Sequence, residues 1–140
     1  MAAVDVVDHY LAAQPELELR RLAHGEWGIT VPADALGMPL DVGLRIADEL
    51  LRAQALALPS AGDLDPWMLL WWNRQTRLVR FGCTRSRDIW VQADLPVAAV
   101  DERAVDRLLG LVTEAAIAVR DYATRARGEA TTPSGGWLPD

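Results

Sequence analysis

Few side chains in this 140-residue chain could carry out chemistry, and they are scattered. The single cysteine, Cys83, has no predicted helix N-terminus beside it to lower its pKa, so we expect a buried structural cysteine. The two histidines, His9 and His24, match no metal-binding spacing such as HxxxH or CxxC. Asp63 and Asp65 lack the other ligands of a calcium loop, so they are predicted to be loop and helix-capping residues.

Nucleotide-binding and acyl-transfer motifs are missing as well, because no GxxxxGK, GxGxxG or GxSxG sequence occurs. We therefore predict no catalytic residue, no metal and no cofactor, and a protein that is not an enzyme. Five arginines at positions 74, 77, 80, 85 and 87 could bind an anionic partner. Surface charges beside acids are usually solvated, so we interpret this basic stretch as an exposed hairpin face.

The charge balance narrows the class of partner. Twenty acids against 14 bases give a net charge of −6, which argues against nucleic acid, whose binders need clustered positive charge. Every base is arginine, which is typical of a GC-rich genome. One cysteine fits a reducing compartment, and residues 1–13 lack the basic start of a secretory signal. No apolar run approaches the roughly 18 residues that span a bilayer, so we expect a cytoplasmic protein with no membrane partner.

Tryptophan is the most unusual part of the composition, since six of the nine aromatic residues are Trp. Four of them fall in the block from residue 67 to residue 90, which we expect to be mostly core. Indole is too large for all four to be enclosed in so small a domain, so an exposed one would indicate an interaction surface. The candidate partner or dimer surface consists of Trp67, Trp71, Trp72, Trp90, Leu111, Ala115, Tyr122 and Trp137.

The first half of the chain predicts one helix followed by strands. Apolar residues recur at helical spacing over residues 4–13, and Pro15 ends that helix. Residues 17–31 alternate apolar and polar side chains on both sides of His24-Gly25, which predicts two short strands. The segment from Leu40 to Leu58 is compatible with an alanine-rich helix or with a hairpin turning at residues 47–49. Periodicity alone does not decide between the two.

Capping residues and alternation define the second half. Asp65-Pro66 predicts a helix start, and the apolar residues 67–72 that follow predict a helix buried on all sides or covered by a partner. A hairpin over residues 76–95 places its apolar side chains on one face only if Phe81 lies opposite Val91 and Cys83 opposite Ile89. In that register Trp90 would cover the bare backbone of Gly82.

A long helix closes the domain. Asp101 is predicted to cap a helix over about residues 102–125 with an apolar arc wider than that of a simple surface helix. Gly, Ser, Thr and Pro dominate the residues that follow, so we predict one domain over residues 1–127 and a flexible tail over residues 128–140. Trp137 lies in that tail, where it is either a docking residue or an ordinary tail residue.

The block from Trp71 to Ala123 resembles YbjN-domain proteins, a family with a type III secretion chaperone-like fold. The stretch from Trp72 to Phe81 is similar to the family's RNxxL…F turn, and residues 88–96 are similar to its GDVYLVxxLP strand. Residues 98–110 match AAVDEEALDRLLG closely, whereas Arg87 stands where the family usually has glycine. The resemblance is to actinobacterial members.

This resemblance implies an α+β fold in which an antiparallel sheet is flanked by helices, in the order α-β-β-β-β-α-β-β-α. It also implies the hairpin for Leu40 to Leu58, and frequent homodimers. We therefore expect a non-enzymatic, chaperone-like module that holds a segment of a client protein as a homodimer. The alternative is a regulatory module that senses a small ligand in a pocket lined by Trp71, Trp72 and Trp90.

Overall fold

The structure is a computed structural model that describes residues 1–33 and 37–131. Its elements follow the predicted order, with one additional 3₁₀ turn at Val97–Ala99. They are α1 (Ala3–Ala12), β1 (Glu18–Ala23), β2 (Glu26–Val31), β3 (Leu40–Ala47), β4 (Leu50–Leu58), α2 (Pro66–Gln75), β5 (Val79–Cys83), β6 (Ile89–Pro96) and α3 (Glu102–Thr131).

The six strands form one antiparallel sheet in the order β1-β2-β3-β4-β6-β5. The α+β architecture that we predicted is thereby confirmed. Most neighbouring strands are consecutive in the chain, and the β1–β2 and β3–β4 pairs are tight hairpins, which is the simplest way to build an antiparallel sheet. Only β4 and β6 are separated in sequence, because α2 and β5 lie between them in the chain.

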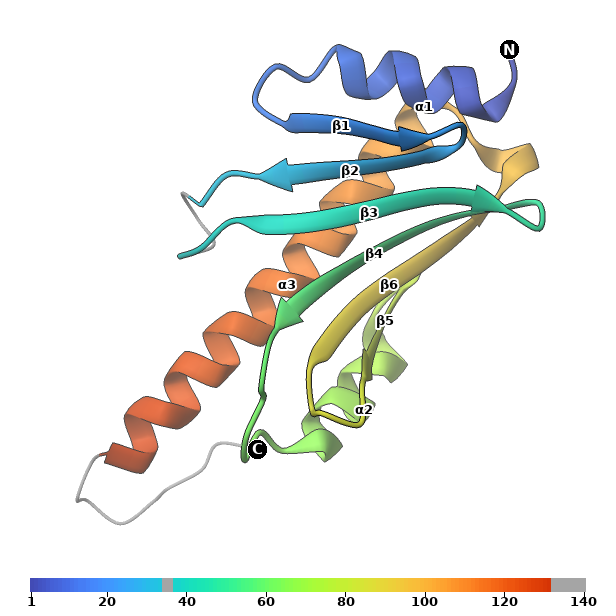
Figure 1. The fold of residues 1–140 in the computed structure, drawn as a ribbon. Coiled ribbons are helices and arrows are strands. Elements are labelled where there is room, and N and C mark those ends of the chain that lie inside the picture. Colours follow the sequence, from blue (N-terminus) through green and yellow to red (C-terminus); the bar gives the residue numbers. More distant parts are fainter. Residues whose placement is uncertain (34–36, 132–140) are drawn as a thin grey trace.

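The helices lie against one face of this sheet, and its other face is open. The long α3 packs mainly on β4, and also on β5 and β6, while α1 contacts α3 and α2 contacts β5. Figure 1 looks at the open face, with α3 passing diagonally behind the strands. The molecule therefore has two layers, and its core lies between the sheet and the helices.

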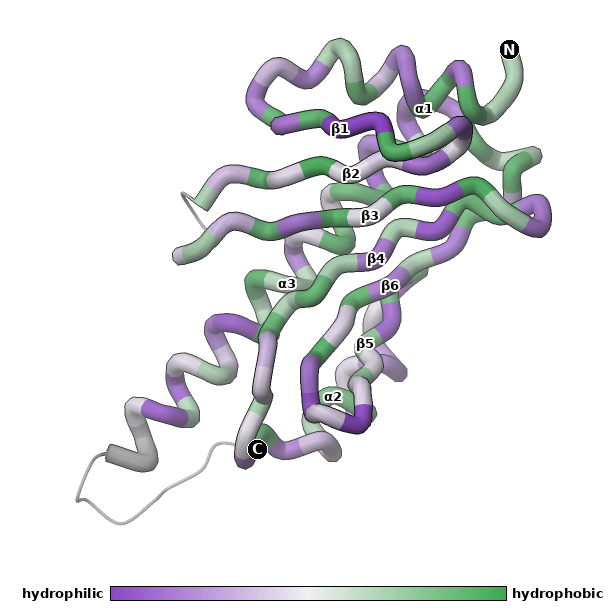
Figure 2. The backbone as a smooth tube through the Cα atoms, in the orientation of Figure 1, coloured by the Kyte–Doolittle hydropathy of each residue, from purple (hydrophilic) through white to green (hydrophobic). Residues whose placement is uncertain are grey.

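Alternation along the strands defines the two faces. Leu51, Ala53 and Ala55 of β4 are buried, whereas Arg52 and Gln54 between them are exposed. Figure 2 shows the same alternation of hydrophobic and hydrophilic residues along the central strands. Alanine on β4 leaves room for α3 to lie close to the sheet. The apolar stripe of α3 that faces it is buried and comprises Val105, Leu108, Leu109, Val112, Ala116 and Val119.

The segment from Leu40 to Leu58 is a hairpin, as the resemblance implied, and not a helix. Its two turn residues, Asp48 and Glu49, have φ angles of 52° and 62°. Two successive positive φ values define the turn whose twist matches a two-residue β-hairpin. Tertiary packing overrides the local helix propensity here, because both strands bury alternate side chains on the covered face of the sheet, which a helix could not do in this position.

The β5–β6 hairpin has the predicted register. Phe81 pairs with Val91 and Cys83 with Ile89. Gly82 also pairs with Trp90, but the predicted covering of Gly82 by this indole is wrong. A Cβ atom built on Gly82 would meet no heavy atom within 4 Å, so the Trp90 ring does not cover this position. The strand pairing was predictable here, whereas the side-chain direction was not.

Both ends of the final helix can be compared with the prediction. Asp101 accepts a hydrogen bond from the backbone N–H of Ala104 at 2.7 Å, as expected of a helix cap. The helix continues to Thr131, beyond the predicted end at Arg125. Residues 128–131, which were predicted to begin the flexible tail, belong to this helix. Trp137 and the rest of the predicted tail, residues 132–140, lie outside the described residues. Among the helices of residues 1–33 and 37–131, none is long and apolar enough to cross a membrane.

Candidate functional site

Helix α2 carries three of the exposed large apolar side chains of the described chain. Asp65 caps the helix by accepting the backbone N–H of Trp67 at 2.9 Å, and Pro66 occupies the first helical position. Leu69 is buried, but Trp67, Leu70 and Trp71 are 76%, 56% and 53% exposed. The expectation that the tryptophans of this block are mostly core is wrong for Trp67 and Trp71. We call these three exposed residues the α2 patch.

A wide hollow of about 800 Å³ lies beside the α2 patch. It is bounded by α2, by the loop at residues 61–65 and by the ends of the β5–β6 hairpin. Its apolar lining includes Leu64, Leu69, Leu70, Phe81 and Ile89. The loop is held to the hairpin because Ala61 donates its backbone N–H to the Arg87 carbonyl at 2.8 Å. An exposed apolar ridge thus lies next to an apolar depression.

The inner side of α2 is fixed by an aromatic cluster. The Trp72 ring lies 5.7 Å from the ring of Phe81 on β5 and 5.5 Å from the ring of Tyr122 on α3. These centroid distances are typical of favourable tilted and edge-to-face pairs. Trp72 therefore anchors α2 to both the sheet and α3, which leaves the opposite side of α2 facing solvent.

Asn73 closes the outer edge of β5. Its side-chain amide donates to the Phe81 carbonyl at 3.1 Å, and its carbonyl accepts the Phe81 N–H at 2.8 Å. The Val79 carbonyl accepts from Thr76 Oγ1 at 2.8 Å and from Arg80 Nη1 at 2.7 Å. An edge strand with unpaired backbone groups is prone to pair with another chain. Here those groups already have partners within the protein.

Other residues of the predicted partner surface lie elsewhere. Ala115 is buried, so the prediction that it contacts a partner is wrong for the folded chain. Leu111 is half-buried, and together with Trp72 and Ala115 it lines a groove of about 290 Å³ between α2 and α3. Tyr122 is likewise half-buried, against Trp72. The side chains of Leu111, Ala115 and Tyr122 mainly pack α3 against the rest of the protein, in agreement with the wide apolar arc of this helix.

The predicted pocket lined jointly by Trp71, Trp72 and Trp90 does not form. Trp72 packs on Phe81, whose side chain points to the covered face of the sheet. Trp90 pairs with Gly82, one position along from the Phe81–Val91 pair, so its side chain points to the open face. The sheet therefore separates these two indoles.

Cys83 is exposed, which contradicts its predicted burial. It is the last residue of edge strand β5 and lines the hollow beside α2, where no element packs over it. In the described part of the chain, no group of three or more His, Cys, Asp or Glu residues could hold a metal ion.

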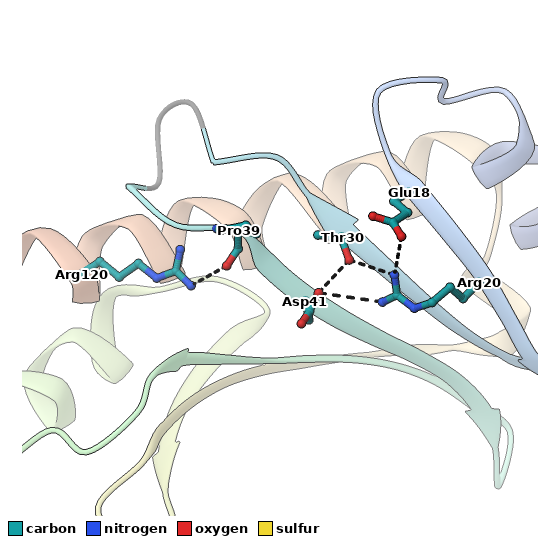
Figure 3. A network of polar contacts seen from close by, with 6 residues as sticks. All are labelled: Glu18, Arg20, Thr30, Pro39, Asp41 and Arg120. Atoms are coloured by element: carbon teal, nitrogen blue, oxygen red, sulfur yellow. Dashed lines mark hydrogen bonds and ion pairs between the residues drawn. The ribbon is translucent and has the colours of Figure 1, made fainter.

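The open face of the sheet is polar, and its arginines are largely paired with acids. Arg45 lies 3.1 Å from Glu26, and Arg52 lies 2.8 Å from Asp94. At the edge of this face, Arg20 donates to Thr30 Oγ1 at 2.9 Å within a network that also includes Glu18 and Asp41 (Figure 3). Pairing of this kind leaves little free positive charge on the sheet.

A shallow hollow of about 470 Å³ lies on the open face near the β3–β4 turn. The Arg52–Asp94 pair and Gln54 contribute to its lining, together with Leu22 and Leu50, which are both exposed. Exposed leucines and paired charges therefore lie side by side in this part of the open face.

Helix α1 is attached to the sheet through a carboxylate. Asp8 accepts the indole N–H of Trp27 at 2.7 Å and the Nε–H of Arg21 at 3.0 Å. The hydrogen bond from Trp27 is the main reason that the pKa of Asp8 lies below its ordinary value, with a smaller contribution from Arg21. Trp27 is buried, so this bond satisfies a polar group that would otherwise be orphaned.

A buried arginine holds the far part of α3. Arg120 donates to the carbonyls of Ala57 and Met38, each at 2.8 Å. It also donates to the Pro39 carbonyl at 3.3 Å, the contact drawn in Figure 3. Neither this role nor that of Asn73 was predicted. The only available signal was that a polar residue interrupts an apolar stretch, which does not identify its partners.

Part of the chain matches a known protein family. The model of the YbjN family, described as "Putative bacterial sensory transduction regulator", matches residues 47–124. A search of curated protein sequences gives no significant match.

Solved structures give the clearest similarity. A chain of the HopA1–SchA chaperone–effector complex matches with a TM-score of 0.64 and 17% identity, over 85% of this chain and 91% of that one. A chain from the Yersinia pestis type III secretion chaperone SycH in complex with a YscM2 fragment matches at 0.63 and 15%, over 84% and 98%. The ExsC–ExsE complex matches at 0.59 and 16%, over 83% and 92%. The TM-scores establish a shared fold, and at identities this low the similarity extends no further than the fold.

Proposed function

Because the chain belongs to the YbjN family and has the fold of type III secretion chaperones, we propose that it is a cytoplasmic, chaperone-like protein-binding module. In this proposal it is not an enzyme, it works as a homodimer, and it holds a segment of a client protein. Two of the structures that it resembles are chaperones bound to protein partners, which supports a protein ligand. A shared fold alone does not define function, so the proposal depends on the surface of this chain.

The α2 patch is the observation that carries the proposal. Two exposed indoles present roughly 300 Å² of contiguous aromatic surface, taking about 250 Å² for a whole Trp side chain. Tryptophan is enriched at the energetic centres of protein interfaces. Exposing three large apolar side chains on a ten-residue helix is otherwise a liability for solubility.

A second copy of the chain fits this surface. A two-fold interface needs a patch that is complementary to itself, and here a ridge and a hollow are adjacent on one surface. Charges also match, since Asp63 and Asp65 precede α2 and Arg74 stands in its last turn. Two antiparallel α2 helices would bring each acidic end to the basic end of the partner. We propose that Trp67 and Trp71 form the core of the dimer.

The open face of the sheet is the proposed place for the client. None of the described helices covers this face, and the hollow near the β3–β4 turn offers exposed apolar side chains at Leu22 and Leu50. An extended segment could place apolar residues there while its polar residues face the paired charges of the sheet. The dimer surface and the client surface are then separate and can be tested separately.

The dimer is tested by light scattering on the purified protein. At tens of micromolar, wild type should have twice the monomer mass of 15.4 kDa. The double variant Trp67→Ala/Trp71→Ala should be monomeric with unchanged secondary structure, because each hot-spot truncation costs about 2 kcal/mol or more. Leu22→Ala, which also removes an exposed apolar side chain, should stay dimeric. A wild type that is monomeric at this concentration would rule out the dimer.

The client is tested by affinity capture followed by direct binding to the captured protein. Leu22→Ala/Leu50→Ala should weaken binding by about tenfold or more, since each truncated contact contributes of the order of 1 kcal/mol. The same variant should remain dimeric. Equal affinity of wild type and this variant for the captured protein would contradict the assignment of the client to the open face.

A ligand-sensing role is the second candidate, and the hollow beside α2 favours it. This hollow is largely apolar and of the size that small-molecule sites have. The family description as a sensory regulator points the same way. A ligand that binds only the folded state must raise the melting temperature, so a thermal-shift screen of metabolites separates this role from client binding.

A further inference from the structure

In the first two turns of α3, the acidic and the basic side chains point in different directions. Glu102 and Asp106, four residues apart, both turn towards α1, where Glu102 lies 3.3 Å from His9 and Asp106 accepts the hydroxyl of Tyr10. Burial and this hydrogen bond to Asp106 both raise the pKa of Tyr10 above its ordinary value, so its proton stays in place. The two acids of this helix start are therefore engaged.

Two arginines of the same turns point elsewhere. Arg103 and Arg107 line a hollow of about 700 Å³, into which Arg77 also reaches from the loop after α2. Leu78 and Leu95 form apolar parts of its wall. The loop and the end of β6 thus bring one more cation and two leucines to the start of α3.

These three arginines lack partners within the described chain. Neither an ion pair nor a side-chain hydrogen bond is formed by Arg77, Arg103 or Arg107 with any residue of 1–33 or 37–131. Arg103 and Arg107 are four residues apart on one helix face, where like charges destabilise a helix. In a protein of net charge −6, three unpaired cations around one hollow represent an unusual local excess.

The only acid in the lining does not neutralise them. Asp101 accepts the N–H of Ala104 as the cap of α3, so its carboxylate already has a backbone partner. One acid against three bases leaves this hollow with a formal charge of +2. The formal positive charge of the hollow therefore comes from the arginine side chains.

We propose that this hollow binds a phosphate monoester. Guanidinium groups bind phosphate through parallel N–H donors, and three of them suit the several oxygens and nearly double charge of such a group. The two leucines would contact the organic part that carries the phosphate. The phosphate could belong to a free small molecule or to a phosphorylated side chain of a partner, because both present the same group.

Calorimetric titration tests this site with three proteins at constant ionic strength. They are wild type, the double variant Arg103→Gln/Arg107→Gln, and the control Arg85→Gln, which removes an exposed arginine at the β5–β6 turn. Phenyl phosphate is the first probe, benzoate is the carboxylate control, and a phosphoserine peptide with its unphosphorylated form identifies the source. Melting temperatures without ligand verify that each variant is folded.

Phenyl phosphate should bind wild type and Arg85→Gln equally, and the double variant about tenfold or more weakly, since hydrogen bonds to charged groups contribute about 1.5–3 kcal/mol each. If phenyl phosphate binds more tightly than the phosphoserine peptide, the site is assigned to a small molecule. If the phosphoserine peptide binds more tightly than phenyl phosphate, the site is assigned to a phosphorylated partner. Benzoate binding as tightly as phenyl phosphate would overturn the phosphate assignment. Absence of binding at about 10 mM, or equal binding to all three proteins, would overturn the site itself.

Discussion

Replacing Asn73 by alanine should destabilise the protein through the edge of its sheet. The amide of Asn73 forms two hydrogen bonds with the backbone of Phe81, at 2.8 and 3.1 Å. A typical intramolecular hydrogen bond contributes about 1 kcal/mol net, so the pair contributes about 2 kcal/mol. Alanine is the better helix former by about 0.6 kcal/mol, which offsets part of the loss. We expect the free energy of unfolding to fall by about 1.5 kcal/mol.

Urea denaturation followed by tryptophan fluorescence measures this change, because Trp72 lies next to Phe81 and reports on the same region. The matched control is Gln75→Ala, which truncates an exposed amide in the last turn of the same helix. That variant should be as stable as wild type or slightly more stable. An intermediate loss is expected for Asn73→Asp, whose carboxylate still accepts the Phe81 N–H but repels its carbonyl.

Two results would refute this reasoning. If Asn73→Ala were as stable as Gln75→Ala, the two hydrogen bonds would contribute nothing net and water would replace them freely. If the slope of unfolding free energy against urea changed strongly, the variant would alter more than one strand edge. Light scattering adds a second check, since unpaired backbone groups at β5 should increase concentration-dependent assembly beyond the wild-type species.

The remaining predictions concern the core and pH. Phe81→Ala should cost about 3–5 kcal/mol in urea denaturation, as for other buried aromatics, and a loss below about 1 kcal/mol would show that its ring is not part of the core. Because the pKa of Asp8 is lowered on folding, its contribution to stability is present above its unfolded pKa and is lost as pH falls through its lower folded value. Asp8→Asn should therefore reduce the loss of stability below about pH 4, and an unchanged acid profile would contradict the role of the Trp27 hydrogen bond.

Alternation and capping predicted most of the fold from the sequence. The register of β5 and β6 followed from a single requirement, that apolar side chains share one face, and both predicted pairs form. Asp65 and Asp101 were identified as caps because their side chains act on their own helices. Such local rules need no knowledge of distant residues, so they can be applied to a sequence directly.

Side-chain direction and exposure were less predictable. Trp90 pairs with Gly82 as expected but leaves it uncovered, because the pairing fixes the backbone and not the χ angles. Cys83 was expected to be a buried structural cysteine because no predicted helix N-terminus lies beside it, yet it is exposed at the end of an edge strand in the described chain. Burial depends on where neighbouring elements stop, which no local pattern records.

The candidate surfaces depended on long-range geometry. Residues 74–87 were read as one basic stretch, but the structure separates their side chains and brings Arg77 to Arg103 and Arg107. Those residues are about 26–30 positions apart in sequence, and only the docking of α2 and α3 on the same sheet unites them. A charge pattern along the chain therefore could not reveal this hollow.

The closed edge at β5 restricts how the proposed dimer can be built. A second copy that extended the sheet would need free N–H and C=O groups on that edge, and those of Val79 and Phe81 already bond to side chains or backbone within the chain. Assembly at this end must then proceed through side-chain packing on the α2 patch. The two modes differ in a measurable way, because loss of Trp67 and Trp71 should abolish a packed dimer, whereas an extended sheet would survive it.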